Sequence, residues 1–110
     1  MAYTFKINDC TWNIVPTQDE SLLLVNNKVG KGSIVYRTRT IYIDSRISLD
    51  NVRRVLGHEL THAFMYDTQI ACIPPYDEED MCEFVAIYNQ KIYRIIDKFI
   101  RKHKKRPNIM

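Results

Sequence analysis

The chain has 110 residues, of which 45% are apolar, and this suits one small domain with a modest hydrophobic core. The formal net charge is +3, but five cations lie within residues 101–106, so the other residues sum to −2 and the positive charge belongs to the end of the chain. No apolar run is long enough to cross a bilayer, which argues against a helical membrane protein.

The cysteines and the first residues indicate the compartment. Cys10, Cys72 and Cys82 are odd in number and lack the CxxC spacing of zinc-binding knuckles. Residues 1–12 mix polar and apolar side chains and contain no apolar signal-peptide core. We therefore expect free thiols and a cytoplasmic protein.

The N-terminal part of the chain is typical of β-strands. Residues 3–15 mix β-forming and polar side chains, and residues 33–43, SIVYRTRTIYI, are rich in β-branched and aromatic ones. Residues 37–39 could turn a hairpin in the middle of the second run, although they lack an Asn-Gly signal. Between the two runs, Gly30 and Gly32 predict a loop.

The C-terminal part is predicted to be helical. Ser48 or Asp50 can cap a helix that continues to about Tyr66, with apolar side chains at spacings of three and four along one side. A loop with two prolines follows, and Asp77 then caps a second helix that continues to about Arg101.

Strands followed by helices predict an α+β fold. We expect a single domain over residues 1–100, in which a small antiparallel or mixed sheet packs with the two helices. Residues 101–110 form a basic tail, which we interpret most simply as solvated.

The clearest motif lies in the first predicted helix, in the segment VLGHELTHAF. His58 and His62 are four residues apart, so their imidazoles project from one side of the helix, and an HExxH segment uses this spacing to bind one zinc ion. Glu59 lies one position along and could reach a water on that ion. The simpler alternative is that both histidines are polar helix residues with local hydrogen bonds.

A catalytic zinc site needs a third protein ligand. We favour Glu83, because the helix from Met81 to Tyr88 is apolar nearly all round, which predicts burial, and a buried carboxylate requires a partner or a metal. The alternative is an exposed glutamate on the helix surface. His103 lies among cations in RKHKKR, which disfavours binding of a dication, so we interpret it as a solvated residue.

These segments resemble the gluzincins, which are zinc metallopeptidases. The resemblance consists of HELTHAF, of a helical glutamate in CEFVA that follows His62 by 21 residues, and of RTRTIYID, which is similar to the edge strand above the active-site helix of that clan. The likeness is greatest to minigluzincins and to the ImmA/IrrE-like peptidases of phages and mobile elements. It implies that His58, His62 and Glu83 bind zinc and that Glu59 is the catalytic base. Larger gluzincins often have an aspartate four residues after the ligand glutamate, and Ile87 occupies that position here.

The resemblance implies a zinc-dependent endopeptidase that acts on peptides or proteins. Glu59 would take a proton from a zinc-bound water and pass it to the leaving amine. An extended substrate could pair with the strand Thr40–Ile43, and the hydroxyl of Tyr76 or Tyr66 could stabilise the oxyanion.

Two other function classes remain open. One is a catalytically weak, zinc-stabilised scaffold that binds a protein partner, although the intact HExxH glutamate favours an enzyme. The other is a nucleic-acid-binding module that uses the basic tail, although no aromatic-rich basic face accompanies that tail in the sequence. The tail could also fold back over the active site. We expect no membrane partner, and the sequence does not indicate the oligomeric state.

Overall fold

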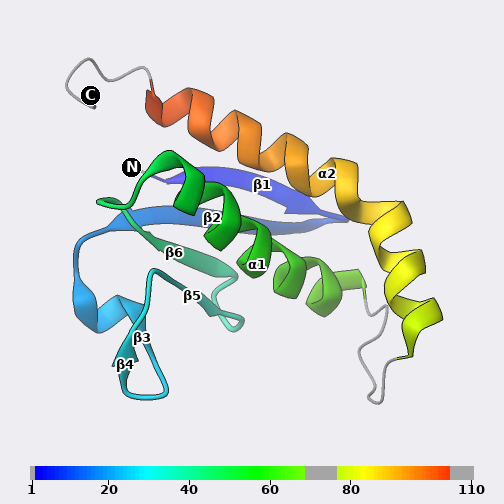
Figure 1. The fold of residues 1–110 in the computed structure, drawn as a ribbon, viewed down its shortest axis with the longest axis horizontal. Helices are drawn as coiled ribbons and strands as arrows, with labels where there is room; N and C mark the ends of the chain where they lie inside the picture. The colour runs from blue at the N-terminus through cyan, green and yellow to red at the C-terminus, as the bar shows by residue number, and fades with distance from the viewer. Residues whose placement is uncertain (1, 69–76, 105–110) are drawn as a thin grey trace.

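The computed structural model describes residues 2–68 and 77–104 (Figure 1). This part of the chain forms an α+β fold, as predicted. Its elements, in chain order, are β1 (Tyr3–Ile7), β2 (Cys10–Thr17), the 3-10 helix η1 (Glu20–Leu23), β3 (Leu24–Val25), β4 (Lys28–Val29), β5 (Gly32–Val35), β6 (Thr40–Asp44), α1 (Leu49–Thr68) and α2 (Glu78–Lys104).

The main sheet is mixed and has the strand order β1-β2-β6-β5. The two outer pairs, β1 with β2 and β6 with β5, are antiparallel, whereas the central pair of β2 and β6 is parallel. The predicted hairpin at residues 37–39 is confirmed, since Arg39 has a left-handed φ of 50° and its N–H donates to the Tyr36 carbonyl at 3.1 Å. The prediction of a loop at Gly32 is wrong, because this residue begins β5.

The position of β6 corrects one expectation from the gluzincin resemblance. The segment Thr40–Ile43 was expected to lie at a free sheet edge, but it pairs with β2 on one side and with β5 on the other. The free edges of this sheet are therefore β1 and β5. Of these, β5 lies against α1, since a Cβ atom built on Gly32 would be only 2.5 Å from Cγ1 of Val55.

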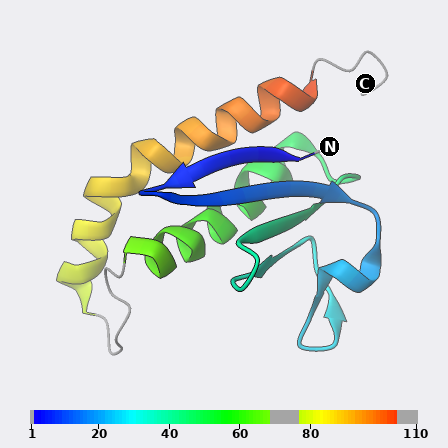
Figure 2. The same ribbon diagram turned by 180° about the vertical axis from the view of Figure 1, so that it is seen from behind.

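The hydrophobic core lies between the sheet and the helices. Figure 1 shows α1 in front of the sheet, and Figure 2, seen from behind, shows β1 and β2 in front of α1, while α2 runs beside β1 in both views. Each large apolar side chain that is fully buried contributes about 1.5–3 kcal/mol to folding. The largest of them come from the strands, η1 and both helices: Trp12, Ile14, Leu23, Ile41, Ile43, Leu56, Leu60 and Ile96.

Side-chain caps define the starts of both long helices, as expected. The hydroxyl of Ser48 accepts a hydrogen bond of 3.3 Å from the backbone N–H of Asn51, ahead of α1. Asp77 accepts 2.8 Å from the N–H of Asp80, and the Asp80 carboxylate accepts from the N–H of Asp77 in return, which is a reciprocal capping box. Within the described ranges, no helix has the length and apolar character needed to cross a membrane.

Candidate metal centre

Helix α1 presents the two histidines of the HExxH segment on one side. Its buried side chains face the sheet and α2, which leaves His58 and His62 exposed. Their ring centroids are 4.9 Å apart and the rings meet edge to face at 78°. Neither imidazole has a hydrogen bond to another described residue, so local bonding does not account for the pair. Two imidazoles side by side on a helix fit two ligand positions of one zinc ion.

Glu59 lies on the inner side of the same turn. The residue is only 8% exposed, and its Cγ is 3.6 Å from the position that a Cβ atom on Gly32 of β5 would occupy. Burial raises the pKa of the Glu59 carboxyl, and the positive charges of His58 and His62 oppose this rise. A carboxyl group with a raised pKa is suited to accept and return a proton near neutral pH.

Tyr36 also belongs to this region, although no sequence motif pointed to it. Burial raises the pKa of the Tyr36 hydroxyl, and the negative charge of Glu59 adds to the effect, as does that of Tyr66. Tyr36 directly follows β5, and β5 runs along α1, which explains why this ring lies near the HExxH helix. The signal in the sequence was its position between the strand and the turn at residues 37–39.

Tyr66, one of the two hydroxyl donors proposed from the sequence, is part of an aromatic cluster. Its ring lies 4.7 Å from the ring of Tyr36 and 6.4 Å from that of Trp12, and the Arg39 guanidinium lies 5.7 Å above it. The ring of Tyr66 thus packs against three neighbours, while the residue remains 47% exposed. The other proposed donor, Tyr76, lies outside the described residues.

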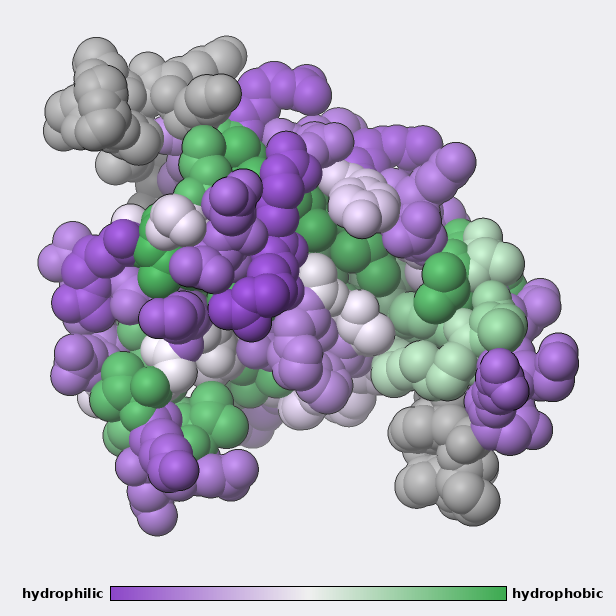
Figure 3. All heavy atoms as spheres, viewed as in Figure 1, coloured by the Kyte–Doolittle hydropathy of each residue, from purple (hydrophilic) through white to green (hydrophobic). Residues whose placement is uncertain are grey.

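Glu83 does not join the histidines in this structure. Its side chain is exposed near the start of α2, so the expected burial of this segment is wrong. Val85 is 53% and Ile87 is 42% exposed, and Figure 3 shows apolar side chains at the surface over the first turns of α2, at the right. Residues 2–68 and 77–104 contain no group of three or more histidine, cysteine or acidic side chains that could hold a metal ion. His58 and His62 therefore lie side by side without a third candidate ligand beside them among the described residues.

His103 is not a simple solvated residue, contrary to our interpretation of the sequence. Its Nδ1 hydrogen-bonds the Phe99 carbonyl at 2.9 Å, and its ring centroid is 4.2 Å from that of Phe99. Its Nε2 is buried and has no hydrogen-bond partner among the described residues. α2 extends to Lys104, so the first residues of the predicted tail are helical.

Comparisons of the chain with protein-family models, with curated proteins and with solved structures find no match. The most distinctive feature of the described residues is a pair of adjacent imidazoles on one side of α1, with a buried carboxyl group between them in sequence.

Proposed function

We propose that the chain is a zinc-dependent peptidase of compact gluzincin type. The observation that carries this proposal is the pair of neighbouring imidazoles, His58 and His62, beside the buried carboxyl group of Glu59. A scaffold helix has no need for two exposed histidines in contact together with a carboxyl group whose pKa burial raises. This set of groups is the one that metal-assisted hydrolysis requires.

His58 and His62 would hold the zinc ion, and Glu83 is our candidate for the third ligand. When bound, the ion supplies a water of lowered pKa and a positive charge that polarises the scissile carbonyl. Because Glu83 is exposed near the start of α2, its participation is a separate question that mutagenesis can answer.

Glu59 would act as the proton carrier. In its ionised form it accepts a proton from the attacking water, and the raised pKa lets it hold that proton and deliver it to the leaving amine. The nearby hydroxyl of Tyr36 is our candidate donor to the oxygen that gains charge. It takes the place of Tyr66, whose ring packs against Trp12 and Arg39.

The substrate would pair with β5, and not with Thr40–Ile43 as the resemblance implied. β5 is a sheet edge beside α1, and an extended peptide can add its main-chain hydrogen bonds to such an edge. Gly32 has no side chain, which lets β5 come close to Glu59 and would hold a paired peptide near the catalytic groups.

The test combines metal analysis with hydrolysis of an unstructured protein, with and without a chelator. We expect about one zinc ion per chain and hydrolysis that the chelator abolishes and added zinc restores. His58→Ala should lose both zinc and activity, and Asn51→Ala, at a partly buried position of the same helix, serves as the control. Zinc binding without hydrolysis would instead indicate the zinc-stabilised scaffold, and no zinc uptake would exclude both.

A further inference from the structure

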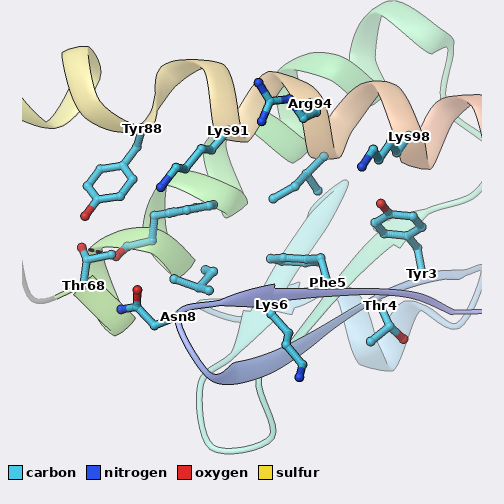
Figure 4. Close-up of a pocket in the computed structure, with 13 residues that line it drawn as sticks. Tyr3, Thr4, Phe5, Lys6, Asn8, Thr68, Tyr88, Lys91, Arg94 and Lys98 are labelled. Atoms are coloured by element: carbon cyan, nitrogen blue, oxygen red, sulfur yellow. Dashed lines mark hydrogen bonds between the residues drawn. The ribbon is translucent and has the colours of Figure 1, made fainter.

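A groove lies between β1 and α2, at the edge of the sheet opposite to β5. It encloses about 470 Å³. Figure 4 shows Tyr3 and Phe5 rising from β1 toward α2, with Lys91 and Lys98 reaching from α2 on the other side. We call it the β1–α2 groove. It is separate from the HExxH region, which lies beside β5 at the other end of the strand order.

The lining of this groove is strongly cationic. Four of its residues are basic and none is acidic: Lys6, Lys91, Arg94 and Lys98. Within the part of the chain that the structure describes, none of the four forms a salt bridge, and the neighbouring acid Asp97 is already paired with Arg53 at 2.9 Å. The net positive charge of the sequence lies in residues 101–110, and the fold brings a second cationic set together in this groove. Spacings of three and four place 91, 94 and 98 on one side of α2.

The open side of β1 offers unpaired backbone groups to the groove. The N–H of Asn13 in β2 donates to the Arg39 carbonyl and so points away from β1. The backbone groups of the neighbouring residue, Trp12, therefore point toward β1, where Trp12 pairs with Phe5. In an antiparallel pair the direction of these groups alternates along each strand. The N–H and C=O groups of Thr4 and Lys6 therefore point outward, and they have no backbone partner among the described residues.

One contact confirms that cations of α2 reach this strand edge. The carbonyl of Ala2, which follows the same alternation as Thr4, accepts a hydrogen bond of 3.1 Å from Nζ of Lys102. The same ammonium lies 5.8 Å from the centre of the Tyr3 ring. A strand paired to β1 would therefore lie within range of the next cations along α2.

The two walls are long enough for a short extended peptide, and the cations of α2 are somewhat closer together than the alternate side chains of a strand. The five residues of β1 span about 17 Å, and alternate side chains of a paired strand would be about 7 Å apart. Lys91, Arg94 and Lys98 rise along α2 in steps of about 4.5 and 6 Å. Acidic side chains at every second position of the peptide would thus all face the basic row, while the intervening side chains would face Thr4 and Lys6.

We propose that the β1–α2 groove binds an extended protein segment with acidic side chains at alternate positions, by strand addition to β1. Strand addition uses the outward backbone groups, and the basic row selects the charge. A second copy of this chain is a poor occupant, because pairing two β1 edges would bring two basic sets together. A nucleic acid would satisfy the charges but not the strand-edge hydrogen bonds. The proposal does not depend on zinc or on peptidase activity.

The test measures binding of fluorescent peptides of roughly seven residues to the full-length protein by anisotropy. The first peptide alternates Thr and Glu, the second has the same composition with its Glu residues in one block, and the third alternates Thr and Lys. We expect the alternating acidic peptide to bind about tenfold more tightly than the block peptide, and the basic peptide not to bind. N-methylation of those peptide amides that face β1 should abolish binding, whereas N-methylation of the intervening amides should have little effect.

Variants connect this binding to the groove. The triple variant Lys91→Glu, Arg94→Glu and Lys98→Glu should bind the alternating acidic peptide about tenfold more weakly or worse. The matched control is Lys28→Glu, Lys31→Glu and Arg37→Glu, which changes the charge equally at exposed sites outside the groove and should leave affinity unchanged. Glu59→Gln should also leave it unchanged, which separates this surface from the proposed active site.

Three results would overturn the proposal, and none of them requires the variants to fold. One is equal affinity for the alternating and block peptides, which would indicate a non-specific cationic surface. Another is insensitivity to N-methylation in both positions. The third is tighter binding of a single-stranded oligonucleotide of equal charge, which would assign the surface to nucleic acid.

Discussion

The Arg39 guanidinium donates two hydrogen bonds, each of 2.9 Å, to the carboxylate of Asp67. The pair connects the turn between β5 and β6 to the last turn of α1. The Asp67 side chain is only 4% exposed and also accepts from the indole N–H of Trp12 in the core. This carboxylate therefore links the sheet to the C-terminal end of the helix that carries His58 and His62.

The first prediction concerns the stability of this link. Asp67→Asn should lower the free energy of unfolding by about 2 kcal/mol at pH 7, because charged hydrogen bonds in a buried site are lost. The control is Asp44→Asn, whose partner Arg46 is about half exposed, and it should cost less than about 1 kcal/mol. Urea unfolding of the two variants measures both. Equal destabilisation by Asp67→Asn and Asp44→Asn would show that burial does not strengthen the hydrogen bonds of Asp67.

The pH dependence of the Asp67 contribution has a definite sign. The hydrogen bonds from Arg39 lower the pKa of Asp67 in the folded protein, and burial opposes this shift more weakly. The unfolded chain thus binds the proton at a higher pH, near the ordinary aspartate pKa of about 4. The stabilisation is present above that pH and is lost as the pH falls through the lower, folded pKa. The difference between wild type and Asp67→Asn should therefore narrow below about pH 4.

The second prediction compares two glycines. A Cβ atom on Gly32 would lie 2.5 Å from Cγ1 of Val55 and 3.3 Å from the Tyr42 carbonyl oxygen, so Gly32→Ala forces a shift and should cost about 1–3 kcal/mol. A Cβ atom on Gly57 would meet only the Cδ1 atom of Ile96, at an ordinary 4.0 Å. Gly57→Ala should stabilise α1 by up to about 1 kcal/mol through helix propensity.

Urea unfolding of both alanine variants checks this pair. Val55→Ala removes the atom that would clash with the new Cβ. It should therefore lower the free energy of unfolding less in the Gly32→Ala variant than it does in the wild type. Simple additivity of the two changes would show that the clash is not the cause.

Local patterns in the sequence were sufficient for the helices and for their starts. Asp77, and Ser48 as one of two candidates with Asp50, were identified as caps because an N-cap depends only on the next three residues. The shared direction of His58 and His62 also follows from helical spacing. These predictions depend on geometry within one or two turns, which the chain encodes locally.

The strand order could not be predicted in this way. β6 pairs with β2 in parallel across an intervening segment that contains η1 and three strands, so its central place depends on contacts that no local pattern reports. The location of Tyr36 near Glu59 follows from that order. The predicted burial around Glu83 failed for another reason. Val85 and Ile87 are apolar, but no described residue covers that side of α2, and helical spacing alone does not show whether a side is covered.

The third prediction tests the proposed base. Glu59→Gln should retain zinc and the fold, because the residue is not a proposed ligand, and should reduce hydrolysis by about 10²–10⁴-fold. Zinc content, a urea unfolding curve and the rate on an unstructured protein are measured on the same sample. Undiminished hydrolysis by a zinc-loaded variant would exclude Glu59 as the base.

The fourth prediction concerns the hydroxyl group of Tyr36. Tyr36→Phe keeps the ring that packs at 4.7 Å against Tyr66 and removes only the oxygen. It should lower kcat by about tenfold or more and change KM little, because a donor to the oxyanion acts in the transition state. Tyr66→Phe is the control and should retain most activity. The reverse ranking would return the role to Tyr66.

The last prediction asks whether Glu83 completes the metal site. Glu78, Glu79 and Asp80 occupy the first turn of α2, where the helix dipole favours acids, whereas Glu83 lies beyond that turn and gains little from it. Glu83→Ala should weaken zinc binding by about 10²-fold or more if it is a ligand, and Glu79→Ala should not change zinc affinity. Competition with a chromogenic chelator measures both affinities.

Because Glu83 is exposed and stands apart from the histidines in this structure, zinc binding through it would draw the start of α2 toward α1. Hydrogen exchange at the first turns of α2 should then slow on zinc addition in the wild type and not in Glu83→Ala. Unchanged zinc affinity in Glu83→Ala would exclude it as the third ligand.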